Sequence, residues 1–130
     1  MPNTILIIED NPENFYLMKY LLENRGYRIF GAEAGKEGLK MAAELRPDCI
    51  LLDIQLPGMD GYQVAVALRQ QSCLDQVPVI AVTSYAMPGD REKAMASGAS
   101  AYIEKPIDPD SFVEEVECHI RAFQTQETAL

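Results

Sequence analysis

Ionisable and hydroxyl side chains end several apolar segments of this 130-residue sequence. Glu9 and Asp10 follow the run TILII, Asp53 follows CILL, Thr83 ends the run VIAV, and Lys105 closes AYIEK. An ionised carboxylate is costly to remove from water unless a positive charge pairs with it. A carboxylate such as Asp53, placed directly after a buried run, is therefore either a turn residue at the surface or part of a site.

The chemistry of these groups becomes specific if they meet in one pocket. Clustered carboxylates repel one another, and one of them tends to stay protonated unless a cation intervenes. A site built from oxygen ligands alone suits Mg²⁺. Lys105 could neutralise charge or bind a phosphoryl oxygen, Thr83 could donate a hydrogen bond to it, and a carboxylate can attack a phosphoryl group to form an acyl phosphate. The pattern favours a pocket that carries a phosphoryl group on Asp53.

Each residue taken alone has an ordinary interpretation. Glu9 and Asp10 precede Asn11 and Pro12, a typical helix start, where acidic residues complement the helix dipole. A single Asp after a strand is usually a turn residue, and a single Lys is usually solvated. The functional interpretation rests on the occurrence of all these groups at successive strand ends.

Five short apolar runs alternate with longer amphipathic segments, and this alternation predicts the elements that position the groups. Strands are expected at residues 4–9, 27–32, 49–53, 78–84 and 101–106. Helices are expected at residues 12–25, 35–46, 61–71, 89–98 and 109–123. Continuously apolar strands between amphipathic helices indicate a parallel sheet covered on both faces. The expected fold class is α/β, a doubly wound five-stranded parallel sheet with five helices in a flavodoxin-like three-layer sandwich, whose sites lie at the carboxyl ends of the strands.

The composition excludes several functional classes. The net charge is −9, with 20 acidic and 11 basic residues, which argues against direct binding to nucleic acid or an anionic membrane. No apolar run approaches the roughly 18 residues that a membrane span needs, and the first residues lack the basic region of a signal peptide. Cys49, Cys73 and Cys118 follow no metal-ligand spacing and are expected to be free thiols in a reducing compartment. We expect a cytoplasmic location.

Four motifs together resemble the receiver domain of two-component response regulators. They are the acidic pair after the first strand, LLDIQLPGMDG around the third, AVTSYA at the fourth and YIEKPI at the fifth. The resemblance spans residues 4–123, and the stretch AVTSYAMPGDREKAMASGASAYIEKPI is most similar to stand-alone regulators of the cell-division and phosphorelay type. It implies a receiver domain over residues 1–123 and a short tail over 124–130, which is too short for an output domain.

The resemblance also implies roles for individual residues. Asp53 matches the phospho-accepting aspartate, and Lys105 matches the lysine that pairs with the phosphoryl group. Thr83 matches the switch hydroxyl, and Tyr102 the aromatic residue whose ring turns inward when that hydroxyl moves. The bond between Lys105 and Pro106 matches one that is cis in the family.

A magnesium site is implied at the same place. Asp10 is the expected direct ligand, Glu9 is expected to act mostly through water, and Asp53 and the backbone carbonyl of Gln55 complete the set. Gln55 and Tyr85 depart from the chemotaxis-type members at the positions that flank the path of hydrolytic water. The rate of dephosphorylation is therefore where the resemblance is weakest.

The function implied is that of a phospho-accepting regulator rather than a conventional enzyme, although it catalyses its own phosphorylation and dephosphorylation. The donor is a sensor histidine kinase or a histidine phosphotransfer protein, or a small phosphodonor. Phosphorylation would shift the surface of the fourth helix, fifth strand and fifth helix. A separate downstream effector protein would bind that surface, without direct nucleic-acid binding or membrane insertion.

Other functions remain open at this point. A phosphatase of the haloacid-dehalogenase type would need a carboxylate where Gln55 stands. A receiver that binds partners without phosphorylation is a second alternative. A flavodoxin-like electron carrier is a third, although the acidic loop EDNPEN lacks the donors that a flavin phosphate requires. His119 is expected to be structural or partly buried, and Tyr85, Met87 and Tyr102 are predicted to form an apolar docking patch.

Overall fold

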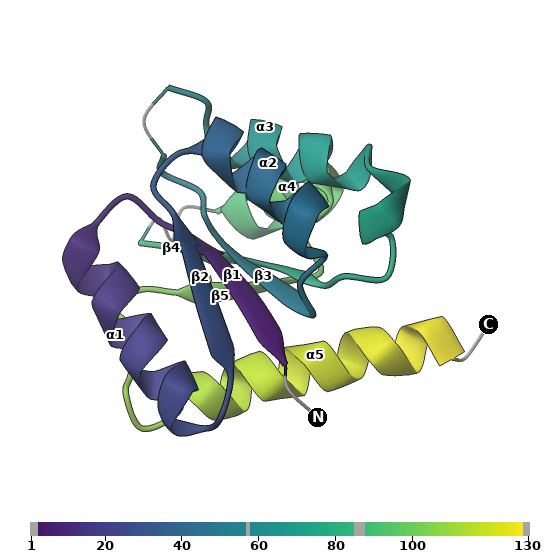
Figure 1. Ribbon diagram of the computed structural model, residues 1–130. Coiled ribbons are helices and arrows are strands. Elements are labelled where there is room, and N and C mark those ends of the chain that lie inside the picture. The colour runs from purple at the N-terminus through teal and green to yellow at the C-terminus, as the bar shows by residue number, and fades with distance from the viewer. Residues whose placement is uncertain (1–2, 57, 85–87, 129–130) are drawn as a thin grey trace.

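A five-stranded sheet forms the centre of the computed structural model, which describes residues 3–56, 58–84 and 88–128 (Figure 1). The strands are β1 (Thr4–Ile8), β2 (Arg28–Ala32), β3 (Cys49–Asp53), β4 (Val79–Thr83) and β5 (Ala101–Glu104). They lie in the order β2-β1-β3-β4-β5, and all neighbouring pairs are parallel. This arrangement confirms the predicted doubly wound α/β fold class.

Helices cover both faces of the sheet. They are α1 (Pro12–Asn24), α2 (Gly35–Leu45), α3 (Gly61–Arg69), α4 (Asp90–Ser97) and α5 (Phe112–Thr128). Figure 1 shows α1 and α5 on one face of the sheet, and α2, α3 and α4 on the other. The chain therefore forms the three layers that the apolar strand pattern predicts.

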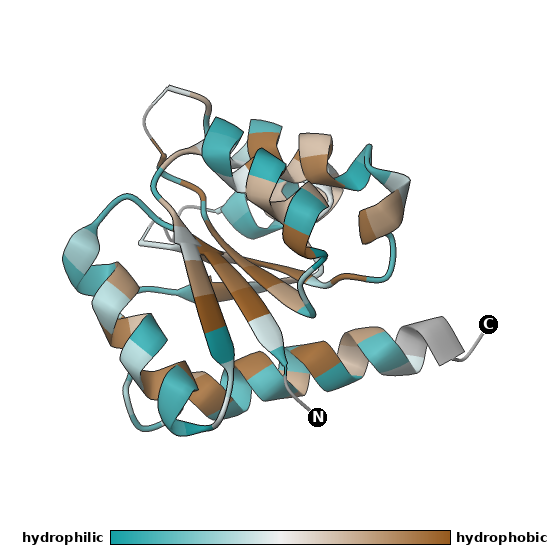
Figure 2. Cartoon of the chain, viewed as in Figure 1, coloured by the Kyte–Doolittle hydropathy of each residue, from teal (hydrophilic) through white to brown (hydrophobic). Residues whose placement is uncertain are grey.

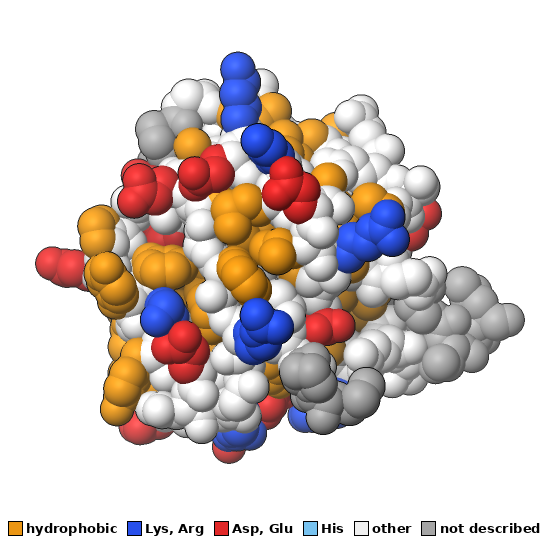
Figure 3. Space-filling view, in the orientation of Figure 1, with side chains coloured by type: hydrophobic (Ala, Val, Ile, Leu, Met, Phe, Trp, Pro, Cys, Tyr) orange, Lys and Arg blue, Asp and Glu red, His pale blue; other side chains and the backbone are white. Residues whose placement is uncertain are grey.

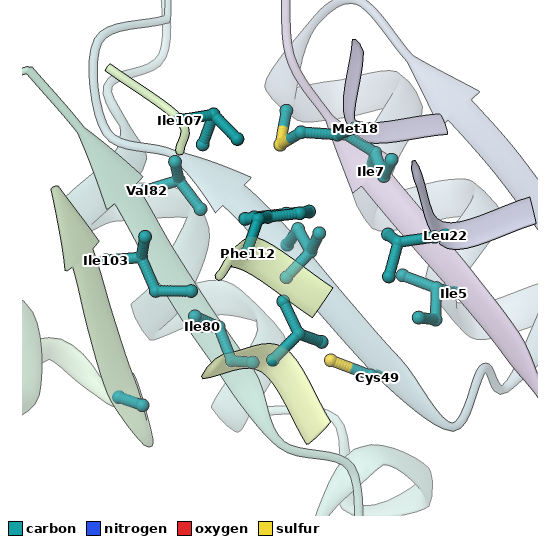
Figure 4. Close-up of a cluster of buried hydrophobic side chains, with 13 residues drawn as sticks. Ile5, Ile7, Met18, Leu22, Cys49, Ile80, Val82, Ile103, Ile107 and Phe112 are labelled. Atoms are coloured by element: carbon teal, nitrogen blue, oxygen red, sulfur yellow. The ribbon is translucent and has the colours of Figure 1, made fainter. Parts of the chain in front are cut away.

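The alternation of side chains along each strand builds a separate core on each face. On the side of α1 and α5, Phe112 is fully buried and lies among strand and helix side chains such as Met18, Leu22 and Val82 (Figure 4). On the other side, alternate strand residues pack against α2 and α3, and buried Ala81 packs against α4. In Figure 2 the middle parts of the strands are accordingly brown, whereas β2 begins with a hydrophilic residue.

Several element boundaries differ from the predicted ones. β1 ends at Ile8, so Glu9 follows the strand, and a short 3₁₀ helix, η1 (Ser72–Leu74), precedes β4. α2 ends at Leu45 because Arg46 adopts the left-handed conformation, with a φ of 47°. α5 begins at Phe112 and continues to Thr128, past the end predicted at Phe123. Helix ends depend on tertiary packing more than the apolar periodicity does, which explains these differences.

Three further sequence expectations can be compared with the structure. Cys49, Cys73 and Cys118 are all free, and Cys49 is buried in the core. Within the described residues, no helix combines the length and apolarity required to cross a membrane. On the face shown in Figure 3, basic side chains are interspersed with acidic and hydrophobic ones instead of forming a continuous basic patch.

Candidate functional site

The sheet order brings the predicted site residues to one edge. β1 lies between β2 and β3, so the chain leaves β1 and β3 beside a topological switch point, where doubly wound sheets bind ligands. Ile8 at the end of β1 pairs with Leu52, the residue before Asp53. Glu9 and Asp10 therefore emerge next to Asp53 although more than forty positions separate them in the sequence.

Local backbone contacts orient the acidic pair. The Glu9 N–H donates to the Ala32 carbonyl over 2.9 Å, which keeps Glu9 in line with the sheet and buries its side chain to 2% exposure. Asp10 is exposed, and α1 begins directly after it. The Asn11 side chain caps this helix by accepting a hydrogen bond from the Asn14 N–H over 3.0 Å. The Glu9 carboxylate is thus buried, and the Asp10 carboxylate lies at the surface.

Asp53 is buried at the end of β3, with 4% of its surface exposed. Its Oδ1 atom accepts a hydrogen bond from the Gln55 N–H over 2.9 Å, which orients the carboxylate within the turn that follows the strand. One carboxylate oxygen from each of Glu9, Asp10 and Asp53 lies within 4.8 Å of the others. The structure therefore brings the three predicted carboxylates together.

Lys105 reaches this cluster from the end of β5. Its Nζ atom lies 2.7 Å from Glu9 Oε1 and 3.6 Å from Asp53 Oδ1, and its side chain is only 10% exposed. The Lys105 N–H donates to the Thr83 carbonyl over 2.8 Å, which ties this residue to the end of β4. The bond to Pro106 is cis, as the resemblance implies. The Lys105 ammonium is closer to Glu9 than to Asp53, the residue on which the resemblance places the phosphoryl group.

The site carries more negative than positive charge. Burial, followed by the adjacent Asp53 carboxyl group, raises the pKa of Glu9 to about 7, and the nearby Lys105 ammonium only partly offsets this rise. One ammonium group thus faces two buried carboxylates and the exposed Asp10. A divalent cation would relieve this repulsion.

The donor set fits magnesium. All three ligand candidates are carboxylate oxygens, and no softer sulfur or imidazole group belongs to the cluster among the described residues. A cavity of about 640 Å³ opens at this edge and leaves room for water and a phosphoryl group. Its walls are formed by Glu9, Asp10, Asn11, Asn14, Asp53, Gln55, Ser84, Lys105 and Pro106. The residues present are therefore compatible with a Mg²⁺ ion.

Of the two predicted switch residues, Thr83 ends β4, the strand next to the one that carries Asp53, and Tyr102 lies on β5, where it pairs with Ala81. Asp53 pairs with Val82 across the sheet, so the buried Thr83 lies one residue beyond that pair. Tyr102 is half-buried on β5 and packs against a small cluster of buried residues on the side of α4. That cluster, called the alanine cluster below, consists of Ile54, Ala81, Ala94 and Ala99.

One contact at the mouth of the cavity was not predicted. The Ser84 hydroxyl donates a hydrogen bond to Gln55 Oε1 over 2.6 Å and joins the loops that follow β3 and β4. Both loops have polar residues at their starts, but no sequence pattern indicates that these two side chains meet. Of the predicted docking patch, Tyr85 and Met87 lie outside the described residues, whereas Tyr102 lies within them.

The sequence matches a family model described as the response regulator receiver domain over residues 5–117. It is 42% identical over 120 residues to the polar-differentiation response regulator DivK of Brucella anthropi, an alignment that covers 92% of this chain and 98% of DivK.

Two solved structures are similar to this one. The receiver domain of the sensor histidine kinase PA1611 from Pseudomonas aeruginosa, solved with a magnesium ion coordinated in its active-site cleft, has a TM-score of 0.84. It is 33% identical, and the match covers 92% of this chain and 98% of that one. A putative response regulator from Chloroflexus aurantiacus has a TM-score of 0.87 at 27% identity, over 93% of this chain and 99% of that one.

Proposed function

The chain belongs to the family of response regulator receiver domains, and from this premise we propose that it accepts a phosphoryl group on Asp53 and switches partner binding through Thr83 and Tyr102. Receiver domains are signalling proteins, and phosphoryl acceptance is the general function of their family. We further propose that the receiver domain comprises residues 1–123 and that residues 124–130 form a short tail, which begins as a continuation of α5.

The observation that carries the proposal is the buried Asp53 carboxylate, which faces an open cavity between two further carboxylates and an ammonium group. In the proposed reaction, an Asp53 oxygen attacks the phosphorus atom of a phosphohistidine in line with the leaving nitrogen. The new O–P bond forms as the N–P bond breaks, and the electron pair of that bond remains on the imidazole nitrogen.

The groups around Asp53 have complementary roles in this reaction. The side chains of Glu9, Asp10 and Asp53 and the backbone carbonyl of Gln55 would hold Mg²⁺. When bound, the ion supplies positive charge that offsets the charge of the phosphoryl oxygens. Lys105 Nζ, 3.6 Å from Asp53, would bind one of these oxygens and exchange its contact with Glu9 for one with the phosphoryl group. The domain would thereby catalyse its own phosphorylation and dephosphorylation.

A phosphoryl group on Asp53 adds negative charge and strong acceptor oxygens beside β4. The Thr83 hydroxyl would move to donate a hydrogen bond to one of them, and the Tyr102 ring would turn inward after it. This change would shift the population of conformations on the surface formed by α4, β5 and α5. A partner with higher affinity for the shifted surface would detect the phosphorylated state.

We propose two classes of protein partner. The phosphodonor is a sensor histidine kinase or a histidine phosphotransfer protein, since histidine kinases phosphorylate the receiver domains of this family. A separate effector protein detects the phosphorylated state, as suggested by the similarity to DivK along nearly its whole length. The excess of acidic residues argues against direct nucleic-acid binding. A cytoplasmic location and the absence of membrane insertion belong to the same proposal.

Intact mass spectrometry after incubation with Mg²⁺ and acetyl phosphate tests the proposed function. We expect one labile phosphoryl adduct on the native protein. Asp53→Asn should abolish it because the amide is not a nucleophile, and excess EDTA should abolish it because the cation is removed. Asp75→Asn, which changes an exposed aspartate in the loop before β4, is the matched control and should form the adduct normally.

An adduct that persists in Asp53→Asn would place the phosphoryl group elsewhere and contradict the proposal. Failure of the native protein to form any adduct, either with acetyl phosphate or with a phosphorylated histidine phosphotransfer protein, would favour binding that is independent of phosphorylation.

A further inference from the structure

The first residue of α3 lies directly against the backbone that carries Asp53. The Gly61 N–H donates to the Ile54 carbonyl over 2.9 Å. A Cβ atom at Gly61 would lie 2.3 Å from Ile54 Cα and 2.7 Å from the Asp53 carbonyl oxygen, both closer than non-bonded atoms approach. No side chain therefore separates α3 from the Asp53 peptide, and a displacement of that peptide must displace the start of α3.

Side-chain hydrogen bonds also fix the start of α3. The Asp60 side chain accepts a hydrogen bond from the Gln63 N–H over 2.9 Å, and the Gln63 side chain accepts one from the Asp60 N–H over 3.2 Å. This reciprocal capping box satisfies backbone donors of the first turn. Tyr62 lies within that turn, so its ring should follow any movement of Gly61.

Tyr62 connects α3 to α4, which lies beside it in Figure 1. The Lys93 Nζ atom of α4 lies 4.4 Å from the centroid of the Tyr62 ring, within the range of a cation–π contact. The ring also packs against the alanine cluster, as Tyr102 does. Burial, with contributions from Asp90 and Asp60, raises the pKa of Tyr62, so its ring remains neutral at physiological pH.

α4 buries little of its surface, and its C-terminal end is held by Arg69, which donates to the Gly98 carbonyl over 2.8 Å. Ala94 is the buried residue of this helix, and Gly89 at its start provides no side-chain cap. A cavity of about 590 Å³ lies between the two helices and the loop after β3, lined in part by Tyr62, Asp90 and Lys93. The first turn of a helix with so little buried surface and adjacent free space can shift at small cost, so the Tyr62–Lys93 contact can influence its position.

We propose that Tyr62 and Lys93 form a second link between Asp53 and α4, by which phosphorylation shifts the first turns of α4 through the start of α3. This link acts in addition to the one through Thr83 and Tyr102, and it rests on the proposed function of Asp53. Its two contacts are the close approach of Gly61 to the Asp53 peptide and the cation–π contact between α3 and α4.

Backbone amide NMR of the ¹⁵N-labelled protein, recorded before and after addition of Mg²⁺ and beryllofluoride, tests the link. Beryllofluoride serves as the phosphoryl mimic. In the native protein we expect the amides of Asp90–Ser97 and of Tyr102 to shift. Lys93→Met and Tyr62→Leu should each reduce the α4 shifts at least twofold, and the double variant should reduce them no further, because both changes break the same contact.

Conservative and remote variants serve as controls. Tyr62→Phe keeps the ring and Lys93→Arg keeps the cation, so both should retain the α4 shifts. Arg91→Met removes an exposed cation of the same helix, for which the described part of the chain shows no ring contact, and should also retain them. The Tyr102 shift should persist in every variant, which separates this link from a general loss of structure.

Two results would overturn the proposal in different ways. The first result assumes that the native protein forms the acetyl phosphate adduct. If Tyr62→Leu and Lys93→Met then retain full α4 shifts, or if Arg91→Met reduces those shifts equally, the link is refuted and the proposed function stands. If neither acetyl phosphate nor a phosphorylated histidine phosphotransfer protein produces an adduct on the native protein, the proposed function and the link both fail.

Discussion

At the amino-end edge of the sheet, charged and polar side chains are paired individually, whereas at the carboxyl-end edge two buried carboxylates share one ammonium group beside a third, exposed carboxylate. At the amino end, Glu117 accepts a hydrogen bond from the Tyr27 hydroxyl over 2.8 Å and pairs with Arg25 at 2.7 Å. Asp48 accepts from the Thr4 N–H over 2.7 Å. Burial and the Glu117 carboxylate raise the pKa of Tyr27 to about 12, so its hydroxyl remains a donor.

Arg69 shows the same individual pairing where α3 meets the start of β4. Its guanidinium donates to the Gly98 carbonyl over 2.8 Å, to the Leu74 carbonyl over 3.1 Å and to the Ser100 hydroxyl over 2.9 Å. The Phe123 ring lies 5.7 Å from its central carbon. A single side chain thus joins α3 to the end of η1, the end of α4, the residue before β5, and α5.

The paired groups at the amino-end edge contribute to stability, whereas the groups at the carboxyl-end edge are arranged for function. Both edges contain a cavity, of about 470 Å³ at the amino end and 640 Å³ at the carboxyl end, so the presence of a cavity does not identify the site. What distinguishes the carboxyl end is buried charge that the protein itself does not neutralise, around Glu9 and Asp53. Such charge lowers stability and is typical of functional sites.

The largest change in stability should follow loss of Arg69. Arg69→Ala removes three charge-assisted hydrogen bonds and should lower the free energy of unfolding by about 2–4 kcal/mol. Urea unfolding measures this value, and Arg91→Ala, at an exposed position of α4, should change it by less than about 0.5 kcal/mol. The acetyl phosphate adduct should still form on Arg69→Ala below its unfolding temperature. Loss of the adduct in the folded variant would show that Arg69 also influences the chemistry at the carboxyl-end edge.

Stability without Mg²⁺ should fall as the pH rises from about 4.5 to 7. The pKa of Glu9 is raised from 4.5 to about 7 in the folded protein, so over this interval the folded state retains a proton that the unfolded state has lost. The free energy of unfolding should decrease by up to about 3 kcal/mol across the interval.

Urea unfolding at several pH values measures this decrease. Glu9→Gln should remove most of it, and Glu44→Gln, at an exposed position of α2, should leave it unchanged. An equal decrease in Glu9→Gln and in the native protein would show that Glu9 is not its source.

Asp53→Asn is expected to change stability less, and to increase it. The substitution removes a negative charge from beside Glu9 while keeping an oxygen that can accept the Gln55 N–H. We expect it to raise the free energy of unfolding in EDTA by about 1 kcal/mol at pH 7.5. Thermal unfolding in parallel with the native protein measures the change. A clear decrease would mean that the Lys105 contact outweighs the repulsion between the carboxylates.

The smallest change in the free energy of unfolding is expected at the amino-end edge of the sheet. Tyr27→Phe removes the hydrogen bond to Glu117 and should lower the free energy of unfolding by about 0.5–1.5 kcal/mol. The yield and lifetime of the phosphoryl adduct should equal those of the native protein, as measured by intact mass over time. A changed lifetime would show that the amino end also influences the chemistry.

The gathering of the carboxylates could be predicted from the sequence because it depends on topology. Parallel strands place the residues after Ile8 and Leu52 at one edge of the sheet, regardless of side-chain detail. The resemblance added the roles of Asp53 and Lys105, which stay predictions until phosphorylation is measured. The cis bond before Pro106 was also implied by the resemblance and is present.

The features that could not be predicted depend on side-chain conformation and on helix ends. Lys105 has several rotatable bonds, and only the assembled site shows that its ammonium lies nearer Glu9 than Asp53. The Ser84–Gln55 hydrogen bond joins two irregular loops, and the Tyr62–Lys93 contact joins two helices whose relative placement no sequence pattern indicates.

The most direct test of the central claim is the dependence of thermal stability on Mg²⁺. The unfolding midpoint of the native protein at pH 7.5 should rise with Mg²⁺ concentration, as expected for a ligand that binds the folded state. Asp10→Asn and Asp53→Asn should abolish most of this rise, and Tyr27→Phe should retain it. A midpoint that is independent of Mg²⁺, or that rises equally in Asp10→Asn and Asp53→Asn, would contradict a cation site at the carboxyl-end edge.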